Sequence, residues 1–109
     1  MTMKPSPPEL DLNIDRTPAE TTVHCAGRIT SDTTGLLKTT VKPLLSQSPR
    51  VTLDLADVSY MDSSGLGILV ALYASANRAG CHFKLINLTQ RIKELLSVTQ
   101  LIELRWLGS

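Results

Sequence analysis

Apolar and polar residues alternate in four short stretches of this chain, and such alternation predicts β-strands with one buried face. The stretches are residues 10–14, 20–28, 51–55 and 83–86, and a last short strand is expected over 102–107. Only a turn-rich link separates the first two strands, so they should pair as a hairpin. Residues 57–61, which follow the third strand, are expected to form a loop.

The first predicted helix follows the second strand, and either Ser31 or Asp32 is expected to cap its N-terminus. Four apolar residues have the spacing of a buried helical face: Leu37, Val41, Leu44 and Leu45. Pro43 interrupts this pattern. Because proline lacks an N–H and its ring clashes with the preceding turn, it should kink the helix or split it near Lys42, and we expect the kink.

Two further helices are predicted. One should run from Ser63 to about Ala79 and end at Gly80, a residue suited to a left-handed C-terminal cap. The other should be capped by Thr89, with three apolar residues facing inward: Ile92, Leu95 and Leu96.

Strands and helices alternate from residue 20 onward, and this order predicts the fold class. We expect a single α/β domain whose helices pack on a mixed, mostly parallel sheet of four to five strands. The domain should span residues 10–109, after a disordered proline-rich tail over residues 1–9.

Composition restricts the possible functions. Lysine and arginine number 11 against 10 acidic residues, without a basic run, which argues against a nucleic-acid surface. Cys25 and Cys81 lie in apolar stretches and should be buried, reduced thiols. No cluster has the spacing of a metal site, and neither a metal nor a cofactor is expected. The longest uncharged stretch, 63–77, is shorter than the ~20 residues that span a bilayer, and no signal peptide is recognised, so we expect a cytoplasmic protein.

The most informative residues are Asp62-Ser63-Ser64-Gly65-Leu66-Gly67, which stand at the start of the second predicted helix. They bring two hydroxyls and several free backbone N–H groups to a position where the helix dipole favours negative charge. A phosphate would be stabilised there, either bound or attached to a serine. We therefore interpret the motif as a switch site. The alternative is that Asp62 and Ser63 only cap the helix, with Gly65 relieving crowding near the sheet.

The helix after the motif has two faces of different character. One face is apolar and should pack on the sheet through Leu66, Leu69, Val70 and Tyr73. The other is small and nearly uncharged, and consists of Gly67, Ala71, Ala74, Ser75 and Arg78. Because solvent-facing helix positions normally favour lysine and glutamate, we interpret this face as a partner surface. A second layer of the protein's own core would also explain it.

The run Val51-Thr52-Leu53-Asp54-Leu55, followed by Val58-Ser59-Tyr60-Met61-Asp62-Ser63-Ser64-Gly65-Leu66-Gly67, resembles the signature of STAS domains. More closely, it is similar to the stand-alone anti-sigma factor antagonists of bacteria, over about residues 10–107. The resemblance implies a STAS fold and a small protein that binds an anti-sigma factor, usually one with a serine-kinase fold, and so frees a sigma factor. It further implies that this kinase phosphorylates Ser63 and that a phosphatase restores it. Asp62, Ser64, Gly65 and Gly67 would then lie at the contact.

The chain departs from the family at Gly27-Arg28-Ile29-Thr30, where many relatives have Gly-Glu-Leu-Asp. The family's acidic pair near the switch serine helps to engage the kinase. Arg28 and Thr30 would therefore alter that contact, and Thr30 is included among the predicted partner-binding residues.

The sequence also bears on two other classes of function. A hydrolase is disfavoured, because Met61 replaces the first glycine of the G-x-S-x-G elbow and no histidine and acid are spaced as its partners. We therefore do not expect an enzyme. A STAS subunit that docks on the cytoplasmic ATPase of a membrane transporter would use the same helix without any kinase.

Overall fold

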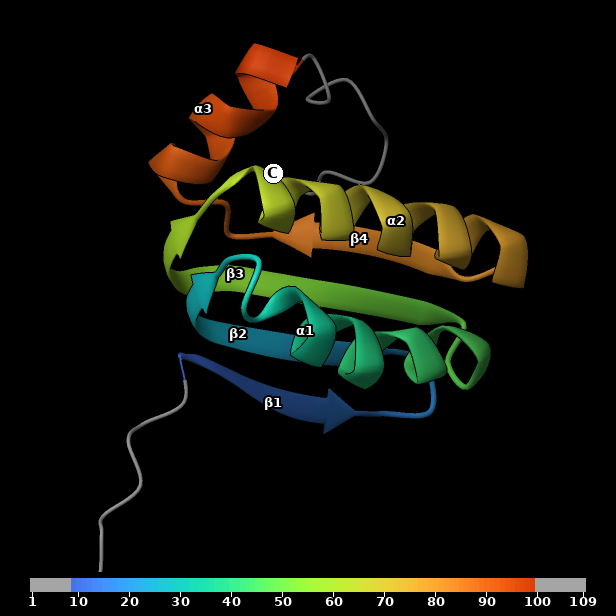
Figure 1. The fold of residues 1–109 in the computed structure, drawn as a ribbon. Coiled ribbons are helices and arrows are strands. Elements are labelled where there is room, and N and C mark those ends of the chain that lie inside the picture. The colour runs from blue at the N-terminus through green and yellow to red at the C-terminus, as the bar shows by residue number, and fades with distance from the viewer. Residues whose placement is uncertain (1–8, 100–109) are drawn as a thin grey trace, which may run out of the picture.

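Residues 9–99, which the computed structural model describes, form one sheet with helices packed against it (Figure 1). In chain order the elements are β1 (Leu10–Arg16), β2 (Thr21–Ile29), α1 (Thr34–Val41), the 3-10 helix η1 (Lys42–Ser46), β3 (Arg50–Met61), α2 (Ser63–Ala79), β4 (His82–Ile86) and α3 (Gln90–Thr99). The expected strand over 102–107 and the tail lie outside the described residues, apart from Glu9.

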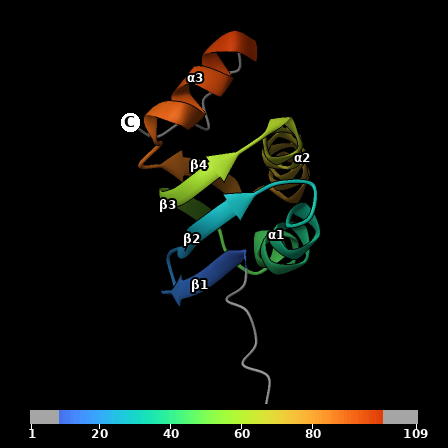
Figure 2. The same ribbon diagram turned by 60° about the vertical axis from the view of Figure 1, so that its left-hand side comes forward.

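The four strands lie in the order β1-β2-β3-β4. β1 pairs with β2 in antiparallel register, which confirms the predicted hairpin, whereas β2, β3 and β4 run parallel to one another. α1 and α2 lie side by side on one face of this sheet, and α3 lies near the end where the parallel strands finish (Figures 1 and 2). The predicted mixed, mostly parallel α/β architecture is confirmed.

The core between the sheet and the helices is almost entirely aliphatic. Strand residues such as Val23, Leu53 and Leu85 have no exposed surface, and Leu69 of α2 packs among them with none either. Cys25 and Cys81 are buried free thiols, as predicted. Burial, with a smaller effect of the Asp54 charge, raises the pKa of Cys25 to about 12, so this thiol is protonated and inert at neutral pH.

The first helix differs from its prediction at both ends. Its N-terminal cap position is Thr33, and neither Ser31 nor Asp32 fills that place. The Thr33 hydroxyl instead holds the preceding loop: it accepts the Thr30 N–H at 2.9 Å and donates to the Arg28 carbonyl at 2.8 Å. At the other end the α-helix stops at Val41 and continues as η1. The proline therefore splits the helix, and the expected kink in one continuous helix was wrong.

The third strand is much longer than predicted. The loop expected over 57–61 was wrong, because β3 continues to Met61. Two register irregularities in its pairing with β2, between His24 and Ala26 and between Gly27 and Arg28, add unpaired residues to β3. Such bulges break the two-residue alternation by which a strand is recognised in a sequence.

The other two helices agree with the sequence. α2 spans Ser63–Ala79, and Gly80 ends it with a φ of 72°, in the left-handed region that glycine adopts without strain. The Thr89 hydroxyl accepts the N–H of Ile92 at 3.3 Å at the start of α3. Among the described residues, no helix is long and apolar enough to cross a membrane.

A polar cluster on β2, β3 and the chain after β4 surrounds Asp54. Asn87 Nδ2 and the Ala56 N–H each donate to Asp54 Oδ1 at 3.0 Å, and His24 Nδ1 lies 2.9 Å from Oδ2. Burial opposes ionisation of Asp54, but the bonds from Asn87, Ala56 and His24 hold the pKa of this carboxyl below its ordinary value. The ionised form is therefore the one that the fold stabilises.

This cluster gives a prediction for acid unfolding. A carboxyl whose pKa is lowered by folding stabilises the protein above its unfolded pKa of about 3.9, and that stability is lost as the pH falls through the folded pKa. We expect Asp54→Asn to make the free energy of unfolding fall less steeply below about pH 4. Urea denaturation at several pH values measures this, with Asp11→Asn, an exposed carboxylate on β1, as the control. Identical pH profiles for Asp54→Asn and the wild type would contradict it.

Candidate functional site

The start of α2 is built by Asp62, which has an extended backbone and caps the helix. Its Oδ1 accepts the N–H of Ser64 at 2.9 Å and that of Gly65 at 3.3 Å. Its own N–H donates to the Ile29 carbonyl at 3.3 Å, which ties the cap to the end of β2. The cap therefore has a fixed place beside the last residues of two neighbouring parallel strands.

Ser63 is the first residue of α2 and is exposed to solvent. None of the hydrogen bonds within residues 9–99 involves its hydroxyl, so the oxygen is accessible to an incoming phosphoryl group. Ser64 is half-buried, and its N–H is held by the cap. Of the two hydroxyls in the motif, that of Ser63 is the better placed for modification.

The start of α2 has fewer free N–H groups than the sequence predicted. The sequence suggested several free N–H groups that would bind a phosphate, but the Asp62 carboxylate already accepts two of them. A phosphate here would therefore lie beside a fixed negative charge and would not occupy an empty cradle of donors. A phosphoryl group attached to the exposed Ser63 hydroxyl is compatible with this geometry, because it can extend into solvent.

The two glycines of the motif have different surroundings. Gly65 is buried, and a Cβ added to it would lie 2.6 Å from Met61 Cγ and 2.9 Å from both Cγ2 and the carbonyl oxygen of Ile29. Gly67 is exposed, and a Cβ added there would meet nothing within 4 Å. The absence of a side chain at Gly65 therefore lets α2 pack closely against the sheet. The burial of Gly65 disfavours the predicted direct contact with a partner.

Thr30 also lies inside the fold. The residue is only 8% exposed, and its hydroxyl accepts the Asp32 N–H at 3.3 Å. Together with the Thr33 bonds described above, this makes a hydrogen-bonded loop next to the start of α2. Thr30 shapes this loop, and its burial disfavours the predicted direct contact with a partner.

The remaining predicted contact residues share the outward side of α2. Gly67, Ala71 and Arg78 are exposed, whereas Ala74 and Ser75 are half-buried. Arg78 Nη2 donates to Ser75 Oγ at 3.1 Å, so the single charge on this face is held at its far end. The buried residues of α2 lie on the opposite side of the helix: Gly65, Leu66, Leu69, Leu72 and Ala76. We refer to Gly67, Ala71, Ala74, Ser75 and Arg78 as the small face.

Two residues at the same end of the sheet were not predicted from the sequence as part of the site. Tyr60 lies opposite Arg28 in the β2–β3 register, with the Arg28 guanidinium 4.6 Å from the ring centroid. The Arg91 guanidinium, from α3, lies 5.8 Å from the same centroid. Nothing in the local sequence around Arg91 indicates this proximity, because the fold brings α3 to the end of β3.

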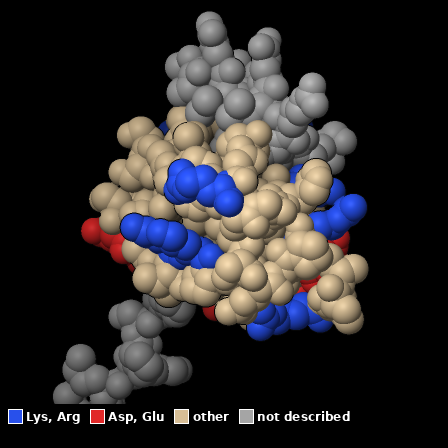
Figure 3. Space-filling view, turned by 90° about the vertical axis from the view of Figure 1, so that its right-hand side faces the viewer, with Lys and Arg blue, Asp and Glu red and all other residues tan. Residues whose placement is uncertain are grey.

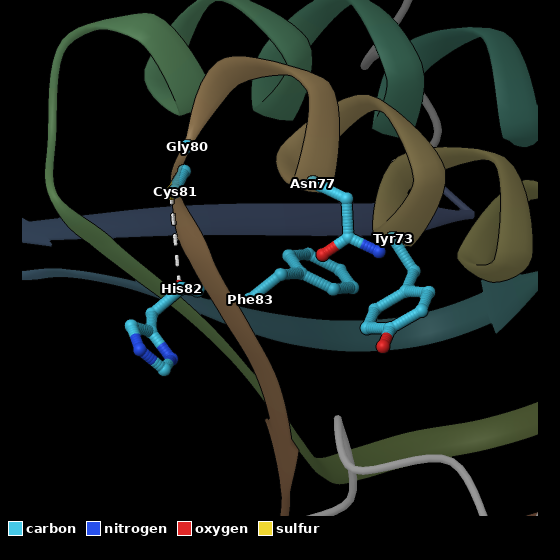
Figure 4. A pocket seen from close by; sticks show the side chains of 6 residues that line it. All are labelled: Tyr73, Asn77, Gly80, Cys81, His82 and Phe83. Carbon is cyan, nitrogen blue, oxygen red and sulfur yellow. Dashed lines mark hydrogen bonds between the residues drawn. The ribbon is translucent and has the colours of Figure 1, made fainter.

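A cavity of about 330 Å³ lies elsewhere, between the second half of α2 and the start of β4. The side chains of Tyr73, Asn77 and Phe83 gather on one side of it, whereas that of His82 points away (Figure 4). Figure 3 views the end of the molecule at the right of Figure 1, where basic side chains stand among uncharged ones and acidic ones lie at the margin. None of the residues lining the cavity belongs to the predicted site.

The cap gives a direct prediction for stability. Asp62→Ala removes the acceptor for two N–H groups at the start of α2, and such losses destabilise proteins by about 1 kcal/mol. We expect that decrease in the free energy of unfolding by urea denaturation. Asp62→Asn is the matched control, because asparagine caps nearly as well as aspartate and should stay close to the wild type. An alanine variant as stable as the asparagine variant would show that the cap contributes nothing.

Comparison with known proteins gives consistent matches over nearly the whole chain. A family model described as "Mlab, STAS domain" matches residues 12–106. The anti-sigma-B factor antagonist of Bacillus subtilis (strain 168) is 33% identical over 94 residues, which are 84% of this chain and 86% of the relative.

Solved structures agree with the fold. A crystal structure of an anti-sigma factor antagonist from Mycobacterium paratuberculosis superposes with a TM-score of 0.80 at 21% identity, covering 94% of this chain and 88% of that one. The anti-sigma factor antagonist SpoIIAA in its unphosphorylated form gives a TM-score of 0.75 at 14% identity, covering 90% and 86% of the two chains. At these identities the superpositions establish the common architecture.

Proposed function

The chain belongs to the STAS domain family, and we propose that it acts as an anti-sigma factor antagonist whose binding is switched off by phosphorylation of Ser63. Its role is regulatory binding, with no catalytic step of its own. The partner is an anti-sigma factor of serine-kinase fold, and a phosphatase reverses the modification. We propose that the chain acts in the cytoplasm, where such partners control transcription.

The observation that carries the proposal is the position of Ser63. It is exposed, its hydroxyl has no hydrogen bond within residues 9–99, and it stands at the first position of a helix fixed by Asp62. A kinase can therefore reach the oxygen without unfolding the domain. Phosphorylation adds a charge of about −1.5 to −2 at this point.

The same charge has opposite consequences in the free protein and in the complex. In the free protein, water and the positive end of the helix dipole stabilise a phosphate on Ser63. In a complex, the phosphate would be removed from water beside the Asp62 carboxylate. An unpaired buried charge costs about 3–5 kcal/mol, which corresponds to a loss of affinity of about 10²-fold to more than 10³-fold. The fold therefore persists while the contact fails.

The small face supports a partner beside Ser63. It begins with Gly67, four residues after the serine, and continues along the outward side of α2. Short side chains let another protein approach the helix backbone closely, and a nearly uncharged surface loses little hydration on contact. We propose that the partner covers Ser63 and Ser64 together with this face.

Incubation of the protein with the anti-sigma factor and ATP, followed by mass spectrometry, tests the switch. We expect one phosphoryl group on Ser63 and none in Ser63→Ala. Label on Ser64 would move the site by one residue, and absence of label would contradict the kinase proposal. Binding to a transporter ATPase in place of an anti-sigma factor would favour the alternative of a transporter subunit.

A further inference from the structure

Two arginines and a tyrosine form a compact group near the switch serine. Arg28 is the second-last residue of β2, Tyr60 is the second-last residue of β3, and Arg91 is the second residue of α3. The two guanidinium groups lie 4.6 and 5.8 Å from the centre of the one tyrosine ring. Three separate elements therefore bring two positive charges to one place, and we call Arg28 and Arg91 the arginine pair.

The arginine pair is not neutralised by the part of the chain that the structure describes. Neither arginine has a salt bridge there, where the only ion pair joins His24 to Asp54. Both arginines are exposed, and the first turn of α3 contains no acidic residue. Arg91 thus stands at the positive end of a helix dipole and shares the Tyr60 ring with a second cation. A bound anion would relieve both unfavourable interactions.

Contact with the Tyr60 ring also orients the arginine pair for binding a ligand. A guanidinium held over an aromatic ring uses its flat face, which leaves its N–H groups free to donate at the edges. Those edges match a carboxylate in a two-bond arrangement. Holding both side chains on one ring lowers the entropy that they would lose when a ligand binds.

We infer that the arginine pair docks an acidic segment of the anti-sigma factor, with aspartate or glutamate side chains on the two guanidinium groups. This inference rests on the proposed function. The group lies close to the switch, because Tyr60 precedes Ser63 by three residues, or roughly 10 Å of extended chain. One partner can therefore contact both the serine and the arginine pair.

Charge complementarity favours a protein carboxylate over a nucleic acid. Nucleic-acid binding depends on several lysines and arginines that each neutralise a phosphate. Here the chain has a net charge of +1 and no basic run. Two guanidinium groups are enough to pair with a short acidic segment and too few to hold a duplex.

Calorimetric titration of the anti-sigma factor into the full chain tests the inference. We expect Arg28→Glu and Arg91→Glu each to weaken binding at least about tenfold, because charge reversal replaces attraction by repulsion. Arg50→Glu is the matched control: Arg50 is exposed at the opposite end of β3, and its reversal should change affinity by less than about twofold. Arg28→Gln removes the charge without reversing it. Thermal unfolding of every variant shows whether a loss of binding comes from a loss of folding.

The outcomes distinguish this inference from the function on which it rests. If the wild type binds and both reversals bind like Arg50→Glu, the arginine pair has no docking role and the proposed function stands. If the wild type does not bind, the proposed function fails, and NMR titration with a hexaglutamate peptide then decides the chemistry of the pair. Local shifts of the Arg28 and Arg91 side-chain N–H signals would support carboxylate binding by the arginine pair, and the absence of such shifts would overturn it. Tighter binding to a DNA duplex, lost in Arg28→Glu, would also overturn it.

Discussion

Ser63→Asp should weaken binding to the anti-sigma factor by about 10²-fold or more while the domain stays folded. The substitution places a permanent negative charge on an exposed residue beside the capping carboxylate of Asp62. In the complex that charge is buried without a partner, at a cost of about 3–5 kcal/mol. In the free protein it lies in the first turn of α2, where an acidic residue stabilises a helix by about 0.3–1 kcal/mol.

Two control variants make this result specific. Ser63→Ala removes the hydroxyl without adding charge, and it should bind like the unmodified protein and resist the kinase. Ser46→Asp adds the same charge to another exposed serine, on η1, and should leave the affinity unchanged. Calorimetry measures the affinities. If Ser46→Asp weakens binding as much as Ser63→Asp does, the effect comes from net charge and not from the position of Ser63.

Gly65→Ala should lower the free energy of unfolding by about 1–3 kcal/mol, although alanine is the better helix former. The added methyl group would lie 2.6 Å from Met61 Cγ and 2.9 Å from the Ile29 carbonyl oxygen, so either α2 or the end of the sheet must shift. Backbone cannot move aside as a flexible side chain can. The shift would displace the start of α2 and with it Ser63.

Gly67→Ala is the matched comparison two residues further along the helix. Its methyl group meets nothing within 4 Å, so only helix propensity acts, and stability should rise by about 0.5–1 kcal/mol. The same chemical substitution should therefore change the free energy of unfolding in opposite directions at the two positions, and urea denaturation of both variants measures this. A stabilised Gly65→Ala protein would contradict the close packing of the helix start.

Much of the fold was predictable because its signals are local. The bounds of α2 follow from the uncharged run over 63–77 and from Asp62 and Gly80, two residues whose backbone and side-chain preferences suit the two ends of a helix. The hairpin of β1 and β2 follows from two alternating runs with a short link. These features depend on a few neighbouring residues, so the sequence alone contains them.

The errors have physical causes that residue patterns and cap preferences do not show. β3 extends through residues 57–61 because its pairing with β2 includes bulges, and bulges depend on the partner strand. Thr33 replaced Ser31 and Asp32 at the helix cap position because its hydroxyl bonds the loop behind it. The first outcome depends on a contact between two separate strands, and the second on side-chain hydrogen bonds within one short loop.

The candidate site was predictable to a similar extent. The sequence identified Ser63 at the helix start, and the structure adds that the residue is exposed and that Asp62 occupies the neighbouring donors. The alternative role suggested for Gly65, relief of crowding near the sheet, agrees with its close approach to Met61 and Ile29. The sequence did not indicate that Thr30 is buried. Nor could it place Arg91 beside Tyr60, since 31 positions separate them in the numbering.

The most direct measurement compares one protein in two chemical states. The fully Ser63-phosphorylated and the unmodified protein are each titrated calorimetrically with the anti-sigma factor, and thermal unfolding of both is recorded. We expect the phosphate to reduce affinity by at least about 10²-fold, with the unfolding free energy changed by no more than about 1 kcal/mol. Equal affinities of two folded forms would contradict a phosphate switch at Ser63.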